Sequence, residues 1–289
     1  MRSHKSEGLH VGAIILLLTS ALSDSAAAQT HAGGLNHAAG APIIGFGAAA
    51  AVSGEEIFVS RPGEFAAFPM PGSEPGSVHI FGRGGDGWVE VAAIPAPSGV
   101  YGDGFGEALA VEGDILVVGA PKENESRGAA YVFVREGTMW SSRERLEAPD
   151  AMPGDAFGSS VAVGAGGQFG VIGAPGRGTS GSVFAYVQSD MGLTSVELTG
   201  SDAPADARFG AAVSVEGDLA LVGAPGPFAL SQFTPPAPPQ AGTGYLFRRS
   251  GTDWTEVARL TPAGGMVAGL SAVLMGGEAY LGSPLANQA

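Results

Sequence analysis

Histidine and cysteine side chains most often form metal and catalytic sites, and this sequence offers few of them. It contains no cysteine and five histidines. His4 and His10 precede residue 28, and His31 and His37 lie in a stretch rich in glycine and alanine. Only His79 falls within a predicted strand, where we expect a structural, partly exposed side chain. We therefore predict no zinc site, and no G-x-S-x-G segment marks a nucleophilic serine.

Acidic side chains are a stronger candidate for chemistry, because Asp103, Asp155 and Asp206 each stand just before a Phe-Gly pair. Two carboxyl groups ~5–9 Å apart in a cleft can act as general acid and base. A metal-dependent hydrolase would require these aspartates to crowd around a central channel. We favour the alternative that they accept backbone hydrogen bonds in turns, as aspartate commonly does.

Two glycine-rich segments, Gly82 to Gly87 and Gly176 to Gly181, match the pattern G-x-G-x-x-G. Both lead into predicted strands, whereas a dinucleotide-binding glycine motif must open a helix whose N-terminus holds the pyrophosphate. We therefore predict no catalytic, cofactor-binding or metal-binding residue, and we expect the protein not to be an enzyme.

The first 28 residues predict a secretory signal peptide. Arg2 and Lys5 precede an apolar stretch from Leu9 to Leu22, and small residues lead to a cleavage site at about Ala28. These fourteen residues are too few for a spanning helix, which needs about 20. We expect a secreted, periplasmic or cell-surface protein with no membrane span. The formal net charge of −14 disfavours nucleic acid and anionic membranes as partners.

The pair Phe-Gly sets the period of the sequence. It begins at Phe46, Phe105, Phe157 and Phe209, in steps of 59, 52 and 52 residues. A second landmark follows each pair, as Val59-Ser60-Arg61-Pro62, Gly119-Ala120-Pro121, Gly173-Ala174-Pro175, Gly223-Ala224-Pro225 and finally Gly282-Ser283-Pro284. An aromatic strand comes next, and in three copies it is followed by Trp88, Trp140 or Trp254. Periods of this size indicate a propeller or a solenoid.

One copy resolves into four strands, expected at residues 105–111, 115–118, 129–135 and 140–146. A four-stranded unit of ~50 residues is a propeller blade. The predicted fold class is all-β, a β-propeller with four complete blades at about 46–97, 105–148, 157–199 and 209–261, and a partial fifth at 269–289. Residues 29–45 are expected to form a flexible tail or a closing strand. Either the sequence is part of a longer product, or the ring closes in another way.

These paired Phe-Gly and Gly-Ala-Pro landmarks resemble the FG-GAP repeats of integrin-α-like β-propellers, over residues 46–284. The resemblance implies a propeller used for extracellular adhesion or protein binding. Such blades often hold calcium in a loop between their first two strands. Here those turns are short, for example Glu112-Gly113-Asp114, and cannot wrap a cation that takes six to eight oxygens. We therefore expect no cofactor and no calcium in these turns, since the usual calcium-loop motif is absent from them.

Long irregular loops between the second and third strands are the predicted binding region, since loops on a rigid scaffold usually carry binding. Two of them contain large apolar residues among prolines, which are Phe65, Phe68, Met70, Phe228, Leu230 and Phe233. Either these side chains form an exposed patch typical of protein interfaces, or they fold back over their own blades.

The function predicted is a secreted, non-catalytic binding or adhesion module that recognises a protein or glycan through variable loops on one propeller rim. The alternative is a propeller domain of a longer secreted enzyme or cell-surface protein whose active region lies elsewhere. This prediction rests on the fold resemblance and on the absence of a catalytic constellation from the sequence.

Overall fold

The computed structural model describes residues 45–63, 74–85, 87–189, 192–226, 242–262 and 268–282. Within these ranges the chain forms four four-stranded antiparallel sheets and a two-stranded one. Each sheet is ordered along the chain, so strands that neighbour each other in a sheet are also consecutive in the sequence, and every sheet is an up-and-down meander. The predicted fold class, a β-propeller with four complete blades and a partial fifth, is confirmed.

The blades are named in chain order. Blade 1 contains β1 (Ala50–Ser53), β2 (Glu56–Arg61), β3 (Ser77–Gly84) and β4 (Gly87–Pro95). Blade 2 contains β5 (Ala108–Glu112), β6 (Ile115–Ala120), β7 (Ala129–Glu136) and β8 (Met139–Leu146). Blade 3 contains β9 (Ser160–Val163), β10 (Phe169–Ala174), β11 (Ser182–Ser189) and β12 (Gly192–Leu198). Blade 4 contains β13 (Ala212–Glu216), β14 (Leu219–Ala224), β15 (Thr243–Ser250) and β16 (Asp253–Leu260), and blade 5 contains β17 (Ser271–Met275) and β18 (Glu278–Gly282).

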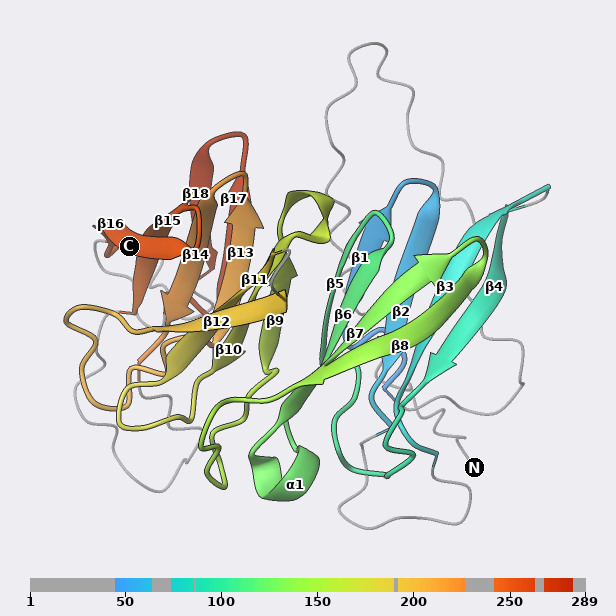
Figure 1. Ribbon diagram of the computed structural model, residues 1–289, viewed down its shortest axis with the longest axis horizontal. Helices are drawn as coiled ribbons and strands as arrows, with labels where there is room; N and C mark the ends of the chain where they lie inside the picture. Colours follow the sequence, from blue (N-terminus) through green and yellow to red (C-terminus); the bar gives the residue numbers. More distant parts are fainter. Residues whose placement is uncertain are drawn as a thin grey trace, which may run out of the picture.

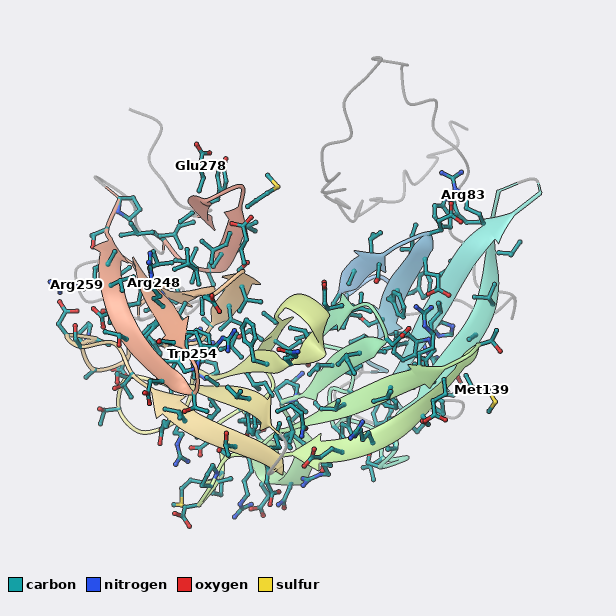
Figure 2. All side chains as sticks on the ribbon, turned by 45° about the horizontal axis from the view of Figure 1, so that its top comes forward. Arg83, Met139, Arg248, Trp254, Arg259 and Glu278 are labelled. Carbon is teal, nitrogen blue, oxygen red and sulfur yellow. The ribbon has the colours of Figure 1, made fainter. Side chains whose placement is uncertain are left out.

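The blades follow one another along an arc, with blade 1 at one end and β17 and β18 at the other (Figures 1 and 2). The first strands β1, β5, β9, β13 and β17 contact each other in succession and line the inside of the arc. Because the strands of each blade alternate in direction, the loops from the second to the third strand and the loops between blades lie on one edge of the blades, and the other turns lie on the opposite edge. We call the edge with the second-to-third-strand loops and the interblade loops the loop rim, and the edge with the short turns the turn rim.

Two short helical turns lie between consecutive strands, although the sequence showed almost no helix signal. The turn α1 (Glu123–Ser126) lies on the loop rim at the lower edge of Figure 1, and η1 (Ala165–Gly167) lies on the turn rim. The predicted first strand of blade 2 also begins too early. It starts at Ala108 and not at Phe105, because Phe105 and Gly106 belong to the preceding turn, in which Gly106 has φ 97°.

The phenylalanines of the last three Phe-Gly pairs lie in the hydrophobic core, whereas Phe46 is partly buried. Phe105, Phe157 and Phe209 are almost completely buried. Phe105 packs edge-on against Tyr131 and Phe133, at centroid distances of 5.7 and 6.1 Å. This arrangement recurs in blade 4, where Phe209 meets Tyr245 and Phe247. Edge-to-face contacts at these distances stabilise a core beyond the area that they bury.

The glycines of both landmarks join one blade to the next. Within a blade, the amide of the Phe-Gly glycine donates to the carbonyl of the Gly-Ala-Pro glycine, as from Gly158 to Gly173 at 2.9 Å. Between blades the backbones lie so close that a Cβ added to Gly119 would stand 1.9 Å from the carbonyl oxygen of Gly158. The corresponding distance from Gly173 to Gly210 is 2.0 Å. At these two boundaries the backbones approach so closely that a residue with a Cβ would not fit in place of Gly119 or Gly173.

We predict that Gly119→Ala lowers the free energy of unfolding by about 3 kcal/mol, because the new methyl group must push blades 2 and 3 apart. Gly85→Ala is the matched control, since a Cβ at Gly85 meets nothing within 4 Å. Urea unfolding of both variants measures the difference. Equal losses of stability in the two variants would contradict this account of the glycine contact.

Candidate functional site

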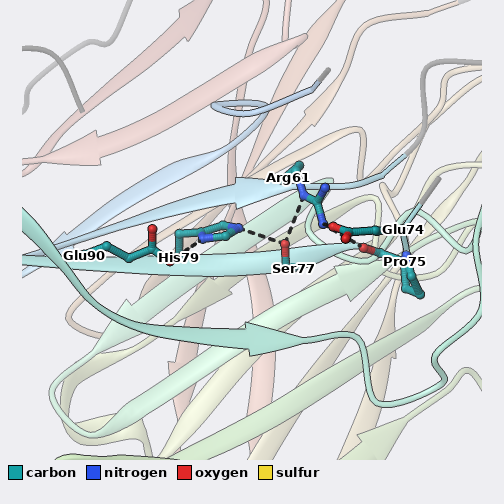
Figure 3. A network of polar contacts seen from close by, with 6 residues as sticks. All are labelled: Arg61, Glu74, Pro75, Ser77, His79 and Glu90. Carbon is teal, nitrogen blue, oxygen red and sulfur yellow. Dashed lines mark hydrogen bonds and ion pairs between the residues drawn. The ribbon is translucent and has the colours of Figure 1, made fainter. Parts of the chain in front are cut away.

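A polar network in blade 1 contains the side chains that most resemble a catalytic group (Figure 3). The Nε2 atom of His79 lies 2.9 Å from the hydroxyl oxygen of Ser77, and its Nδ1 atom lies 2.8 Å from Oε1 of Glu90. Arg61 Nε donates to the Ser77 hydroxyl at 3.2 Å. Because that hydroxyl accepts from Arg61, its own proton is available for His79 Nε2, and Nδ1–H then donates to Glu90.

Serine, histidine and carboxylate in this order form the hydrogen-bonded chain of a hydrolytic triad. The expectation that His79 is partly exposed was wrong, because its side chain is only 4% exposed beneath Phe46 and Ser77 is only 7% exposed. The Arg61 guanidinium, paired with Glu74 at 2.8 Å, also contacts the Ser77 hydroxyl. A nucleophile needs access to its substrate, so we interpret the network as a buried clamp between β2, β3 and β4.

The other blades place a different aromatic side chain where blade 1 has His79. In blade 2 it is Tyr131, whose hydroxyl donates to Glu123 at 2.6 Å, and Arg145 Nε donates to the same carboxylate at 2.8 Å. Burial, followed by the hydrogen bond to Glu123 and the charge of that carboxylate, raises the pKa of Tyr131 to about 12. The phenol therefore stays protonated, and Glu123 anchors the loop that contains α1.

The aspartates before the Phe-Gly pairs serve the interblade loops. Asp155 Oδ2 accepts from the Met152 amide at 3.0 Å and from Arg177 at 2.9 Å, and its side chain is 4% exposed. The backbone hydrogen bond is the role expected for it. Asp103 is buried at the equivalent position before blade 2, but Asp206 is exposed, because Ala207 takes that position before blade 4. The described ranges contain no group of three His, Asp or Glu side chains that could hold a metal ion.

Backbone strain gathers on the loop rim. Seven described residues other than glycine have a positive φ, and they are Asn124, Glu125, Ser126, Asp150, Ala156, Asp206 and Arg208. All seven belong to α1 or to the interblade loops, and thus to the loop rim. On the turn rim, the described residues with a positive φ are glycines, such as Gly113 and Gly217.

Hydrogen bonds across the blade boundary hold this strained backbone. The carbonyl of Ser126 accepts from the amides of Gly154 and Ala156, at 3.1 and 2.8 Å. One boundary further on, the Asp206 amide donates to Thr179 at 2.7 Å. At these two boundaries the second-to-third-strand loop is therefore joined by backbone hydrogen bonds to the loop that enters the next blade.

The loop-rim residues that the sequence singled out cannot be placed on this surface. Phe65, Phe68, Met70, Phe228, Leu230 and Phe233 all lie outside the described residues. The described part of the rim adds a large apolar side chain that the sequence analysis missed, Met152, which is 63% exposed. Composition does not distinguish Met152 from a core methionine, since only the loop conformation turns it outward.

We predict that Asp155→Ala lowers the free energy of unfolding by about 3 kcal/mol, because it leaves Nη1 of the mostly buried Arg177 guanidinium and the Met152 amide without the carboxylate that accepts from them. The matched control is Glu197→Ala, which removes the other carboxylate paired with Arg177, one whose side chain is 41% exposed. That exposed pair is worth less than about 1 kcal/mol. Thermal or urea unfolding distinguishes the two, and similar losses would argue against a structural role for Asp155.

No helix in the described segments is long and apolar enough to cross a membrane. No curated protein matches the chain. Among solved structures, it is similar to a provisionally assigned 6-phosphogluconolactonase from Bacteroides fragilis, with 12% identity, a TM-score of 0.46, and coverage of 75% of this chain and 57% of that one. It is also similar to a mutant Aleuria aurantia lectin in complex with Fucalpha1-6GlcNAc, with 12% identity and a TM-score of 0.40. This similarity covers 72% of this chain and 59% of the lectin chain. The chain thus spans less than two thirds of either structure.

The FG-GAP repeat family model matches three consecutive segments, residues 88–133, 140–186 and 194–247. Each matched segment starts in the last strand of one blade and ends in the third strand of the next. The repeat of the sequence is therefore one strand out of phase with the blade, and it includes the glycine contacts that join two blades. The three matches cover just over half of the sequence, and this chain belongs to the FG-GAP repeat family.

Proposed function

We propose that this protein is a secreted, non-catalytic binding module that recognises an extracellular protein or glycan through its loop rim. The observation that carries the proposal is the strain in that rim, where all seven described left-handed residues other than glycine lie. A left-handed residue with a side chain costs roughly 1–2 kcal/mol. Such conformations persist where the surrounding structure enforces them, and they cluster at binding and catalytic sites.

The form of the rim supports recognition of a macromolecule more than of a small molecule. Hydrogen bonds between consecutive loops hold the surface, so little conformational entropy is lost when a partner binds. Val100 and Met152 present apolar area on this rim, which also carries exposed charged side chains such as Glu125 and Arg208. Apolar anchors within a polar surround are typical of protein interfaces.

Two observations support the non-catalytic part of the proposal. The Ser77–His79–Glu90 network is buried, and Asp155 is committed to Arg177 and to a backbone amide. A candidate nucleophile or general acid has to be within reach of its substrate.

The proposal that the protein is secreted rests on the sequence of residues 1–28, and the intact mass of the exported protein tests it. Cleavage after Ala28 is the expected result, and an exported protein that retains residues 1–28 would contradict it.

We predict that Met152→Asp weakens binding to the partner about tenfold or more, because it replaces an exposed apolar side chain of the rim with a charge. The full chain is expressed with its own leader, purified from the exported fraction, and screened on a glycan array and on immobilised fibronectin and collagen. Surface plasmon resonance then measures the affinity of each variant for every probe that binds.

The matched control is Met139→Asp on the turn rim. Met139 is also an exposed methionine, 74% exposed at the first position of β8, next to the turn from β7 (Figure 2). We expect its affinity to stay within about twofold of the wild-type value, since exposed substitutions away from a site have little effect. Equal losses in both variants would remove the loop rim as the binding surface. Binding to none of the probes would contradict the proposed partner classes.

A further inference from the structure

The fourth strand of a blade supplies a tryptophan to the interface with the preceding blade. Trp140 of blade 2 meets Phe58 of blade 1, with ring centroids 5.6 Å apart. Trp254 of blade 4, labelled in Figure 2, meets Phe169 of blade 3 at 5.8 Å. An indole against an aromatic ring therefore fills both interfaces near the turn rim.

Each tryptophan has an arginine as its cross-strand partner. The registers pair Arg83 with Trp88, Arg135 with Trp140, and Arg249 with Trp254. The guanidinium of Arg135 lies 5.3 Å from the ring of Trp140, and that of Arg83 lies 4.7 Å from the ring of Trp88. These are cation–π distances.

Blade 3 departs from this arrangement. The same register pairs Gln188 with Leu193, so both the arginine and the tryptophan are replaced. The facing side chains of blade 2 are also smaller. By strand register Val117 takes the position of Phe58, and Ile115 takes that of Phe169.

A pocket of about 120 Å³ lies at this interface. Its inner wall is apolar and includes Ile115, Val117 and Ile172 from the second strands and Leu193 from the fourth. The turn that contains η1 closes one side, where a Cβ on Gly167 would stand 2.3 Å from Ile115. The exposed side chains at its mouth are polar, Arg143, Glu144, Gln168 and Gln188.

We propose that this pocket binds a small aromatic molecule of the indole class, with its ring where the neighbouring interfaces hold tryptophan. An engineered apolar cavity of similar size, ~150 Å³, binds benzene. The chain itself shows which group fits this place between two blades, because Trp140 and Trp254 occupy the equivalent volume in blades 2 and 4. The polar mouth suits a ligand whose ring carries a hydrogen-bonding or charged substituent, which Arg143 and Glu144 can meet.

Indole is the probe. We expect the wild-type protein to bind one indole per chain with a dissociation constant of about 0.1–1 mM, the range open to so small a ligand. At 1 mM indole, the melting temperature should rise by about 1–2 °C. Isothermal titration calorimetry gives the stoichiometry. Cyclohexanol is the aliphatic comparison, and equal affinity for it would overturn the aromatic specificity.

Filling the pocket should abolish binding. Leu193→Trp restores the side chain of the other blades and should weaken indole binding at least tenfold. Val117→Phe fills the same space from blade 2, so one of the two variants suffices if the other folds poorly. Val196→Trp is the matched control, because it adds a tryptophan to the same strand at an exposed position outside the pocket. We expect its indole affinity to be unchanged.

Unchanged binding in both filled variants, or no binding of indole by the wild-type protein at 2 mM, would overturn the proposal. Met152→Asp separates this site from the proposed function. It alters the loop rim and should leave indole binding intact, so either proposal can fail alone.

Discussion

The close approach of glycine backbones between blades is the constraint on which the rest of this structure depends. At the boundaries between blades 2 and 3 and between blades 3 and 4, the carbonyl of a Phe-Gly glycine faces the α-carbon of the preceding blade's Gly-Ala-Pro glycine, as Gly158 faces Gly119 and Gly210 faces Gly173. A second contact runs alongside, where Gly128 and Gly181 meet the backbones of Phe157 and Phe209 through isolated parallel bridges. Because no side chain separates the blades at these points, the distance between them is set by the backbone. The phenylalanine beside each glycine is carried into the blade core by the same turn, so one dipeptide both spaces the blades and fills them.

This constraint explains why the order of the blades could be predicted from the sequence, although the start of β5 and the polar network of blade 1 could not. The landmarks recur with their spacing because each must meet its partner in the next blade, and the order of blades followed from them directly. The start of β5 was missed by three residues, since a Phe-Gly pair looks like strand sequence although Gly106 has a left-handed φ. The Ser77–His79–Glu90 network was missed for another reason. Ser77 and His79 share a strand face, which the sequence does reveal, but Glu90 reaches His79 only through a register shift between Ile80 and Phe81 that no sequence pattern marked.

The position of the loop rim could be predicted from the sequence, but its backbone conformation could not. Alternating strands put the irregular loops on one edge, which the sequence reading obtained from topology alone. The left-handed run at Asn124, Glu125 and Ser126 was not foreseen, because only asparagine among these residues favours that conformation. It is stabilised from outside the loop, by the amides of Gly154 and Ala156 in the approach to the next blade. Conformations held by a neighbouring blade cannot be inferred from local sequence preference.

Backbone contacts between blades also leave the side chains inside each blade free to differ. One strand position carries His79, Tyr131, Phe184 and Tyr245 in successive blades, and the polar partner changes with it, from Glu90 in blade 1 to Glu123 in blade 2 and Asp202 in blade 4. The blades therefore act as internal references for one another. A position that has the same residue in every blade is needed for the packing of the scaffold. A position at which one blade differs from the others is not constrained by that packing. The family signature of this chain lies almost wholly among the first kind. Its function is to be sought among the second, where Leu193 replaces tryptophan and where the loops of the rim differ in length and conformation.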